Sequence, residues 1–368
     1  MLQSIQIARA VAVIGVLLCH LEWVRNDIHG SINHLSDVWL LMGHGVDLFF
    51  CISGFIIAYL LSQERLSTYD FFSRRIVRIY PLYWTFALSY VVAKSLACRF
   101  GVPEECYREH DVGNIASSLL ILPQTREPVL SVAWSLEHEV IFYAIAGLVC
   151  VVWGKSIFRL LQVVTLLGCV GVVAHVVIPN LTGVRPWDYH LFSLYHFEFA
   201  AGIAVFLMKD RLVNVSPLLA TTVGVVGFVA TGVSAELMPG PREDIEIARA
   251  GLAGLVSTLG YALSSGVILT GFLAAEARGL FKNGPRVWIY LVAALVLVGN
   301  ASYALYLIQP LAYGVIGKAY RAVGVDVVLL APALAVAIVA TLIAGTVWFT
   351  LIERPFLRVA RRVLEPAG

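Results

Sequence analysis

Residues 9 to 20 read RAVAVIGVLLCH, and this stretch decides the fold. Arg9 and His20 enclose an apolar run that, with its neighbours, reaches the ~20 residues of a transmembrane helix. Their separation of eleven residues brings both side chains to one helix face, about 16 Å apart along the axis. Ionisable groups at such depth are costly and therefore indicate function. The structural alternative is an arginine that snorkels to lipid headgroups and a histidine satisfied inside the bundle.

The composition is that of a polytopic membrane protein. Of the 368 residues, 59% are hydrophobic and 14% are charged, whereas soluble domains carry about a quarter charged residues. The mean hydropathy is +0.83. The net charge is only +2 and the basic residues are spread over short loops, which gives no indication of nucleic-acid binding.

Ten apolar runs predict the architecture, an all-α bundle of about ten transmembrane helices within a single integral-membrane domain that covers 1–368. The run 287–298 is expected to be a re-entrant or interfacial segment before the ninth span, and an eleventh span is the alternative. The expected spans lie near 6–24, 39–62, 79–97, 135–153, 160–178, 191–208, 214–235, 251–274, 299–318 and 327–351.

The loops differ in charge and in cysteine content. Most of the 26 lysines and arginines fall on the side of the N-terminus, so the positive-inside rule predicts that both termini are cytoplasmic. Cys98 and Cys106 flank the start of an outer loop, where a disulfide or two free thiols are both open. No cluster has zinc or iron spacing, so we expect no metal.

Acidic side chains are expected at membrane depth in two spans. Asp47 lies within GVDLFFCISGF, residues 45–55, in the outer half of the second span. SVAWSLEHEV, residues 131–140, places Glu137 and Glu139 just inside the outer interface. Residues two apart do not share a helix face, so we expect one of these two carboxylates to face the bundle.

Basic and hydroxyl side chains form two further motifs. FFSRRIVRIYPLYW, residues 71–84, places Arg74 and Arg78 one helical turn apart, where both guanidinium groups can reach the same phosphate. Anchoring to anionic lipid is the alternative for this cluster. GNASYALYLIQP, residues 299–310, supplies hydroxyl groups, for which anchoring at the membrane interface is the alternative.

The order of these motifs resembles the acyltransferase 3 family, in particular its exopolysaccharide acyltransferases. Over about 350 residues the resemblance rests on the Arg-x10-His pattern, GVDLFFCISGF, the arginine cluster, Trp134-Ser135-Leu136 with Glu139, GNASYALYL and Ile352-Glu353-Arg354-Pro355. Members of this family are bacterial inner-membrane enzymes that O-acylate extracytoplasmic glycans. Gln309 stands where many members have histidine, which puts a second base from that helix in doubt.

The resemblance implies transfer of an acyl group, expected to be acetyl, from acyl-coenzyme A on the cytoplasmic side to a hydroxyl of an extracytoplasmic or lipid-linked glycan. His20 is the expected base because histidine titrates near neutrality. Glu139 is its expected partner, Asp47 an orienting carboxylate and Arg9 a further member of the catalytic set. The residues expected to bind the donor are Arg74, Arg75, Arg78, Tyr303 and Ser302.

Alternatives stay open for the mechanism and the function. The acyl group can pass directly to the glycan, or through a transient acyl-histidine. A proton-coupled transporter would use His20, Asp47 and Glu139 as a relay, although inverted repeats are not evident. A structural subunit is a third alternative.

Overall fold

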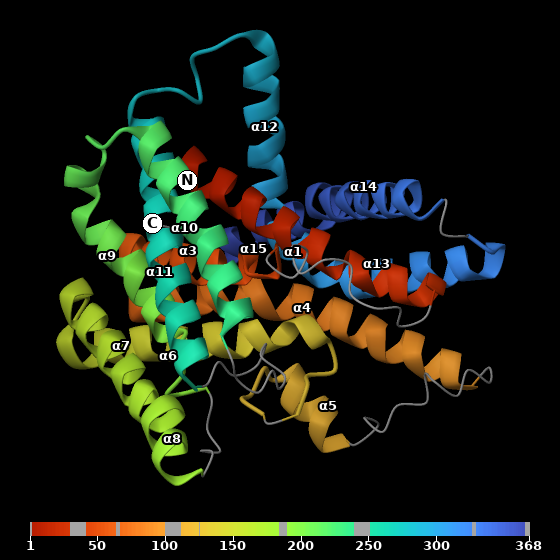
Figure 1. Cartoon of the computed structure of the whole chain (residues 1–368), viewed down its shortest axis with the longest axis horizontal. Helices are drawn as coiled ribbons and strands as arrows, with labels where there is room; N and C mark the ends of the chain where they lie inside the picture. The colour runs from red at the N-terminus through yellow and green to blue at the C-terminus, as the bar shows by residue number, and fades with distance from the viewer. Residues whose placement is uncertain are drawn as a thin grey trace. The chain divides into compact units, whose positions relative to one another are not determined.

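The computed structural model describes residues 2–29, 42–63, 67–99, 112–124, 126–183, 190–238, 251–325 and 329–364 (Figure 1). Within these ranges the regular structure is helical and no strand occurs, which confirms the expected all-α class. Apolar residues that continue around most of each helix explain this choice, since a helix satisfies its own backbone hydrogen bonds in lipid.

The regular structure consists of helices, and irregular helical turns join several of them. In chain order the elements are α1 (Gln3–His29), α3 (Gly45–Leu61), α4 (Thr68–Arg99), α5 (Val112–Leu119), η2 (Ser131–Ala133), α6 (Trp134–Trp153), α7 (Ile157–Val172), η3 (Val173–Val177), α8 (Ile178–Thr182), α9 (His196–Leu212), α10 (Pro217–Leu237), α11 (Gly251–Ala277), α12 (Arg286–Asn300), α13 (Ser302–Val323), α14 (Leu330–Trp348), η5 (Phe349–Glu353) and α15 (Arg354–Leu364).

Several helices are long and apolar enough to cross a membrane. Among the described residues there are seven, or eight if α12 and α13 together form one broken span. Each of the ten expected spans falls on a helix, but α3 and α9 have only 17 residues each, fewer than the ~20 of a typical span. The multi-pass character is therefore confirmed, while the number of ten spans and the orientation of the termini stay predictions.

A sharp bend precedes the expected ninth span. Helices α12 and α13 meet at 70° across a break at Ala301. This geometry fits either a broken span or the re-entrant segment that the sequence predicts for 287–298. Gly299 permits the close approach at the end of α12, because a Cβ atom there would overlap the backbone carbonyl of Gln6.

The chain divides into two compact units. Unit 1 comprises Met1–Cys19, His34–Thr68 and Ile141–Ser302, and unit 2 comprises His20–Asn33, Tyr69–Val140 and Tyr303–Gly368. Helices α1 and α6 are continuous and each contributes residues to both units. The expectation of a single domain over 1–368 therefore stays a prediction.

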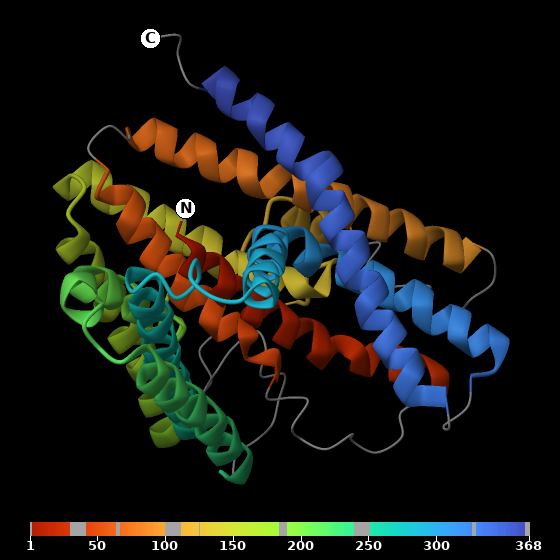
Figure 2. The same ribbon diagram turned by 90° about the horizontal axis from the view of Figure 1, so that it is seen from above.

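Glycines bring the helices of unit 1 close together. Helices α10 and α11 lie side by side in both views (Figures 1 and 2). Helices α3 and α9 pack through Gly54, which faces the backbone of Phe199, and Gly202, which faces the backbone of Cys51. Small residues at helix contacts are the usual means of close packing in membranes. Unit 1 is therefore a tightly packed helical body.

Unit 2 contains irregular helices. Proline lies inside α4 at Pro81 and inside α13 at Pro310. Figure 2 shows α14, η5 and α15 as one long blue helix, and η5 is a π-helical turn within it. Proline and π-helical turns disturb the regular hydrogen bonding of a helix and are common at functional sites.

One cysteine near the end of α4 is oxidised. Cys98 is disulfide-bonded, whereas the free thiols among the described cysteines are Cys19, Cys51, Cys150 and Cys169. Cys106, the partner that the sequence suggests, lies outside the described residues. A disulfide at this helix end is expected of a protein segment that folds in an oxidising compartment.

Candidate active site

His20 occupies a defined position in unit 2. Its ring stacks on Trp23, with ring centroids 4.0 Å apart and planes inclined by 15°. The side chain of Gln309 lies beside the ring. Its Nδ1 is buried and has no hydrogen-bond partner among the described residues. The imidazole is thus held in place while one ring nitrogen is left without a protein partner, as a general base requires.

Gln309 is the residue that departs from the family pattern, and it has a structural role here. Its side chain is completely buried, and its amide Nε2 donates to the carbonyl of Tyr306 at 3.1 Å. Because this bond fixes the amide, Gln309 presents its side chain to His20 in one orientation. A neutral amide therefore orients the imidazole from α13.

Tyr306 connects α13 to the start of α6. Its hydroxyl lies 2.7 Å from the hydroxyl of Ser135 and donates to the carbonyl of Val132 at 2.8 Å. Ser135 belongs to the Trp134-Ser135-Leu136 motif. This motif thus has a structural role, because it anchors the helix that carries Gln309.

Tyr303 lies at the start of α13 among charged side chains. Its hydroxyl donates to the carbonyl of Ile79 at 3.0 Å. The carboxylates of Glu139 and Glu353 and the guanidinium of Arg78 are within electrostatic range of this hydroxyl. Three residues that the sequence singled out, Tyr303, Glu139 and Arg78, are therefore brought together in unit 2.

Glu353 is a member of this cluster that sequence reasoning did not select. It is 6% exposed and ends the π-helical turn η5. The signal was present, since Ile352-Glu353-Arg354-Pro355 is one of the motifs on which the family resemblance rests. In the sequence, Glu353 looks like an ordinary charged residue at the end of an apolar helix. Only the fold places it near Tyr303.

The neighbouring acid, Glu137, has a different environment from Glu139. Glu137 is almost completely buried and accepts a hydrogen bond of 3.1 Å from the amide of Gln124. Glu139 is only partly buried. The two carboxylates therefore meet different surroundings in unit 2, as their spacing of two residues predicts.

The arginine cluster lies on the first turns of α4. Arg74 is exposed, whereas Arg75 and Arg78 are partly buried. The predicted helical spacing of Arg74 and Arg78 is confirmed, since one continuous helix contains both. Arg78 is the member of the cluster that lies within electrostatic range of the Tyr303 hydroxyl.

The other residues selected from the sequence lie in unit 1. Arg9 is 7% exposed, and its Nε donates to the hydroxyl of Ser302 at 3.0 Å. Asp47 is 2% exposed, and its Oδ2 lies 3.2 Å from Nδ1 of His44. Unit 1 thus joins Arg9 with Ser302 and gives Asp47 a histidine neighbour.

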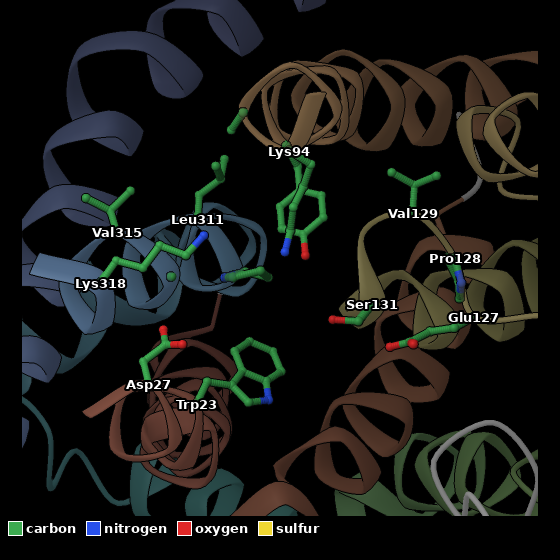
Figure 3. Close-up of a pocket in the computed structure, with 14 residues that line it drawn as sticks. Trp23, Asp27, Lys94, Glu127, Pro128, Val129, Ser131, Leu311, Val315 and Lys318 are labelled. Carbon is green, nitrogen blue, oxygen red and sulfur yellow. The ribbon is translucent and has the colours of Figure 1, made fainter. Parts of the chain in front are cut away.

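A cavity of about 320 Å³ lies within unit 2 (Figure 3). Its walls come from the later parts of α1, α4 and α13 and from the segment before η2. Trp23 connects it to His20, because the indole ring both lines the cavity and stacks on the imidazole. The lining residues are Trp23, Asp27, Tyr90, Ala93, Lys94, Glu127, Pro128, Val129, Ser131, Pro310, Leu311, Gly314, Val315 and Lys318.

The sequence did not predict this cavity. Its charged members, Asp27, Lys94, Glu127 and Lys318, are far apart in the chain and belong to no recognised motif. In the part of the chain that the structure describes, no three histidine, cysteine, aspartate or glutamate residues are grouped so that they could hold a metal ion.

Comparisons with known proteins identify the family of the chain. Residues 2–351 match the family Acyl_transf_3, described as an acyltransferase domain. The chain is 30% identical over 346 residues to the "Exopolysaccharide production protein ExoZ" of Rhizobium meliloti (strain 1021), with 88% of this chain and 92% of that protein covered. No solved structure matches the chain. The chain belongs to the acyltransferase 3 family and is a multi-pass membrane acyltransferase.

Proposed function

We propose that the protein moves an acyl group, expected to be acetyl, from acyl-coenzyme A on the cytoplasmic side of the bacterial inner membrane to a hydroxyl group of an extracytoplasmic or lipid-linked glycan. A relative named as an exopolysaccharide production protein supports a polysaccharide acceptor. The observation that carries the proposal is the oriented imidazole of His20, in a unit that also contains an arginine cluster and a polar cavity.

His20 acts as the general base in this proposal. It takes the proton of the acceptor hydroxyl while the oxygen attacks the thioester carbonyl; the C–S bond then breaks, and the proton goes to the sulfur of coenzyme A. Gln309 and Trp23 hold the ring for this step. The acyl-histidine relay stays open, because a nitrogen without a protein partner serves a nucleophile as well as a base.

The donor is proposed to bind at the start of α4 and α13. Arg78 and its neighbours Arg74 and Arg75 are positioned to neutralise the phosphates of coenzyme A. Glu139 and Glu353 lie within electrostatic range of the same Tyr303 hydroxyl as Arg78, so the donor end of the site combines acidic and basic groups.

Arg9, Ser302 and Asp47 keep their proposed roles in unit 1. A buried guanidinium stabilises developing negative charge on an oxyanion, which suits Arg9 as a member of the catalytic set. Ser302, which hydrogen-bonds Arg9 at 3.0 Å, would orient this guanidinium as well as contact the donor. Asp47 is proposed to act as an orienting carboxylate through His44.

The proposed orientation of the protein in the membrane rests on α4. Its first turns carry three arginines, which favours the cytoplasm. Its last turn carries the oxidised Cys98, which favours the opposite, oxidising side. In unit 2 the later parts of α1, α4 and α13 line one cavity, so the cavity is proposed to be extracytoplasmic.

A transfer assay tests the function. Purified protein with [14C]acetyl-coenzyme A and membranes that contain lipid-linked glycan should release coenzyme A and label the glycan. His20→Ala should lose both reactions while its amount in the membrane stays near normal. No release and no labelling by the wild type would contradict the proposal. Label that stays on wild-type protein without glycan, and is absent from His20→Ala, would favour the acyl-histidine relay.

A further inference from the structure

The unit 2 cavity combines charged, hydroxyl and aromatic side chains. Figure 3 shows Lys94, Lys318 and Ser131 directing their polar atoms toward a common space beside the Trp23 ring. Asp27 and Glu127 place carboxylates at its edge. The volume of about 320 Å³ is at the small end of the usual range for ligand sites. The space therefore suits a compact ligand with many polar groups.

The chemistry of the walls matches a sugar ring. Hydroxyl groups of a pyranose both donate and accept hydrogen bonds, and the cavity offers donors from Lys94 and Lys318 and acceptors from Asp27 and Glu127. The C–H face of the ring is apolar and polarised, which suits the face of an indole such as Trp23. Two cations and two anions balance each other, which favours an uncharged sugar over an acidic one.

The polar walls are held in place before a ligand binds. Asp27, Lys94, Glu127 and Lys318 each have an interaction with another protein group. The Lys94 ammonium lies 5.4 Å from the centre of the Tyr90 ring. Side chains that are already ordered lose little entropy when a ligand binds. The cavity is thus built as a site, and it is more than a gap between helices.

His20 itself does not line this cavity. Trp23 lies between the cavity and His20, because it lines the cavity and stacks on the imidazole with ring centroids 4.0 Å apart. A sugar in the cavity is therefore separated from the base by an aromatic ring. A group bound in the cavity therefore lies beside the reacting position and does not occupy it.

We propose that this cavity is an acceptor subsite that binds an uncharged pyranose unit of the glycan, next to the unit that is acylated. The inference rests on the proposed function, since it needs a glycan acceptor and His20 as base. Trp23 packs against the C–H face of the bound unit, and Lys94, Lys318 and Ser131 bond its hydroxyls. The subsite selects which position along the glycan reaches His20.

Filling the cavity tests this proposal. Val315→Trp places an indole in the cavity wall. The substitution should be tolerated, because the Val315 side chain is 66% exposed. We expect transfer of [14C]acetyl from acetyl-coenzyme A to lipid-linked glycan to fall at least tenfold, while hydrolysis of acetyl-coenzyme A by water stays at the wild-type rate. Val323→Trp is the matched control, because Val323 is an exposed valine of the same helix outside the cavity lining. This control should change neither reaction.

Two outcomes of this experiment overturn the subsite. Transfer equal to wild type in Val315→Trp would mean that no glycan enters the cavity. A parallel loss of transfer and hydrolysis in a variant with normal abundance would assign the cavity to the acyl donor. Neither result contradicts the proposed function. That function is contradicted if the wild type shows no acyl transfer and no hydrolysis.

A milder variant and simple sugars sharpen the test. Ser131→Ala removes one hydroxyl and should raise the KM for glycan by about two- to tenfold, the worth of one net hydrogen bond, with hydrolysis unchanged. Among methyl glucopyranoside, methyl galactopyranoside and methyl mannopyranoside, at least one should inhibit transfer in competition with glycan and leave hydrolysis unaffected. Failure of all three, or stronger inhibition by methyl glucuronide, would contradict an uncharged pyranose.

Discussion

The two units of this protein differ in which residues shape their helices. In unit 1, glycines let helices approach so closely that a side chain at the glycine position would collide with the neighbouring backbone. Gly54, Gly171 and Gly202 are examples. In unit 2, prolines lie inside α4 and α13, and the described cavity lies there; a π-helical turn occurs in each unit, η3 in unit 1 and η5 in unit 2. Tightly packed helices give rigidity, whereas helices interrupted by proline leave room for polar side chains.

The hydrogen bonds that link different elements also differ between the two units. In unit 1, Glu276 accepts bonds from the backbone of Gln3 and Ser4, so a carboxylate stabilises the N-terminus of α1. In unit 2, tyrosine hydroxyls bond backbone carbonyls in other elements. These tyrosines are Tyr80, Tyr83, Tyr303 and Tyr306. A tyrosine gives both an apolar ring and one donor, which suits a unit that must hold a polar site within an apolar bundle.

The largest expected effect separates catalysis from packing. His20→Ala should reduce acyl transfer by about 100- to 10,000-fold, the usual contribution of a general base, while the amount of protein in the membrane stays near normal. Steady-state transfer and immunoblots of membranes measure both. Substantial turnover in His20→Gln would instead make the ring a hydrogen-bonded core residue, and unit 2 would lose its catalytic centre.

A glycine substitution should affect unit 1 through stability alone. In Gly202→Val the new Cβ collides with the backbone of Cys51, and such overpacking costs about 1–3 kcal/mol. We expect a thermal midpoint lower by several degrees in detergent and a normal rate per folded molecule. Gly266→Ala is the control, because the nearest atom to its Cβ is at an ordinary 3.5 Å. A normal midpoint for Gly202→Val would refute the tight contact of α3 and α9.

The arginines of unit 2 should differ in their effect on the donor. Arg78→Ala removes the guanidinium near Tyr303 and should raise the KM for acetyl-coenzyme A about tenfold, the loss of a charge-assisted bond. Arg74→Ala, at an exposed position, should change this KM less than threefold. Initial rates at varied donor concentration give both values. Equal and unchanged values would reduce the cluster to lipid anchoring.

The smallest effect concerns Tyr303. Tyr303→Phe removes only the hydroxyl that donates to Ile79, which is worth about 0.5–1.5 kcal/mol and lowers stability slightly. Transfer should fall by no more than about tenfold if the hydroxyl is structural. A loss of a hundredfold, with a normal thermal midpoint, would show that Tyr303 contacts the reacting groups.

The sequence predicted the helices well because their signal is local. Apolar runs of span length gave a helix at each expected position, from α1 to α14. The spacing of Arg74 and Arg78 on one helix followed from the same periodicity. Long-range contacts leave no such pattern. The approach of Gln309 to His20 joins residues at opposite ends of the chain, and in the sequence alone this glutamine indicates only a missing base.

The cavity and Glu353 were out of reach of sequence reasoning for the same reason. Lys94 and Lys318 belong to different helices, and their approach depends on how α4 and α13 pack. Isolated lysines near the ends of spans are common as interfacial anchors, so neither attracted notice. Glu353 approaches Tyr303 through tertiary packing around a π-helical turn, which apolar periodicity does not predict.

The π-helical turn has a consequence for how the last segment tolerates changes in length. An α-helix turns about 100° per residue, so one residue more or less rotates everything beyond it by that angle. The turn Phe349–Glu353 contains such an extra residue within an otherwise continuous helix. The wide π-helical turn absorbs this residue, so deleting Thr350 should restore regular winding and leave Glu353 facing in nearly the same direction. A deletion elsewhere in this segment would instead rotate everything beyond it by about 100°, so the turn is the place where the last segment tolerates the loss of one residue.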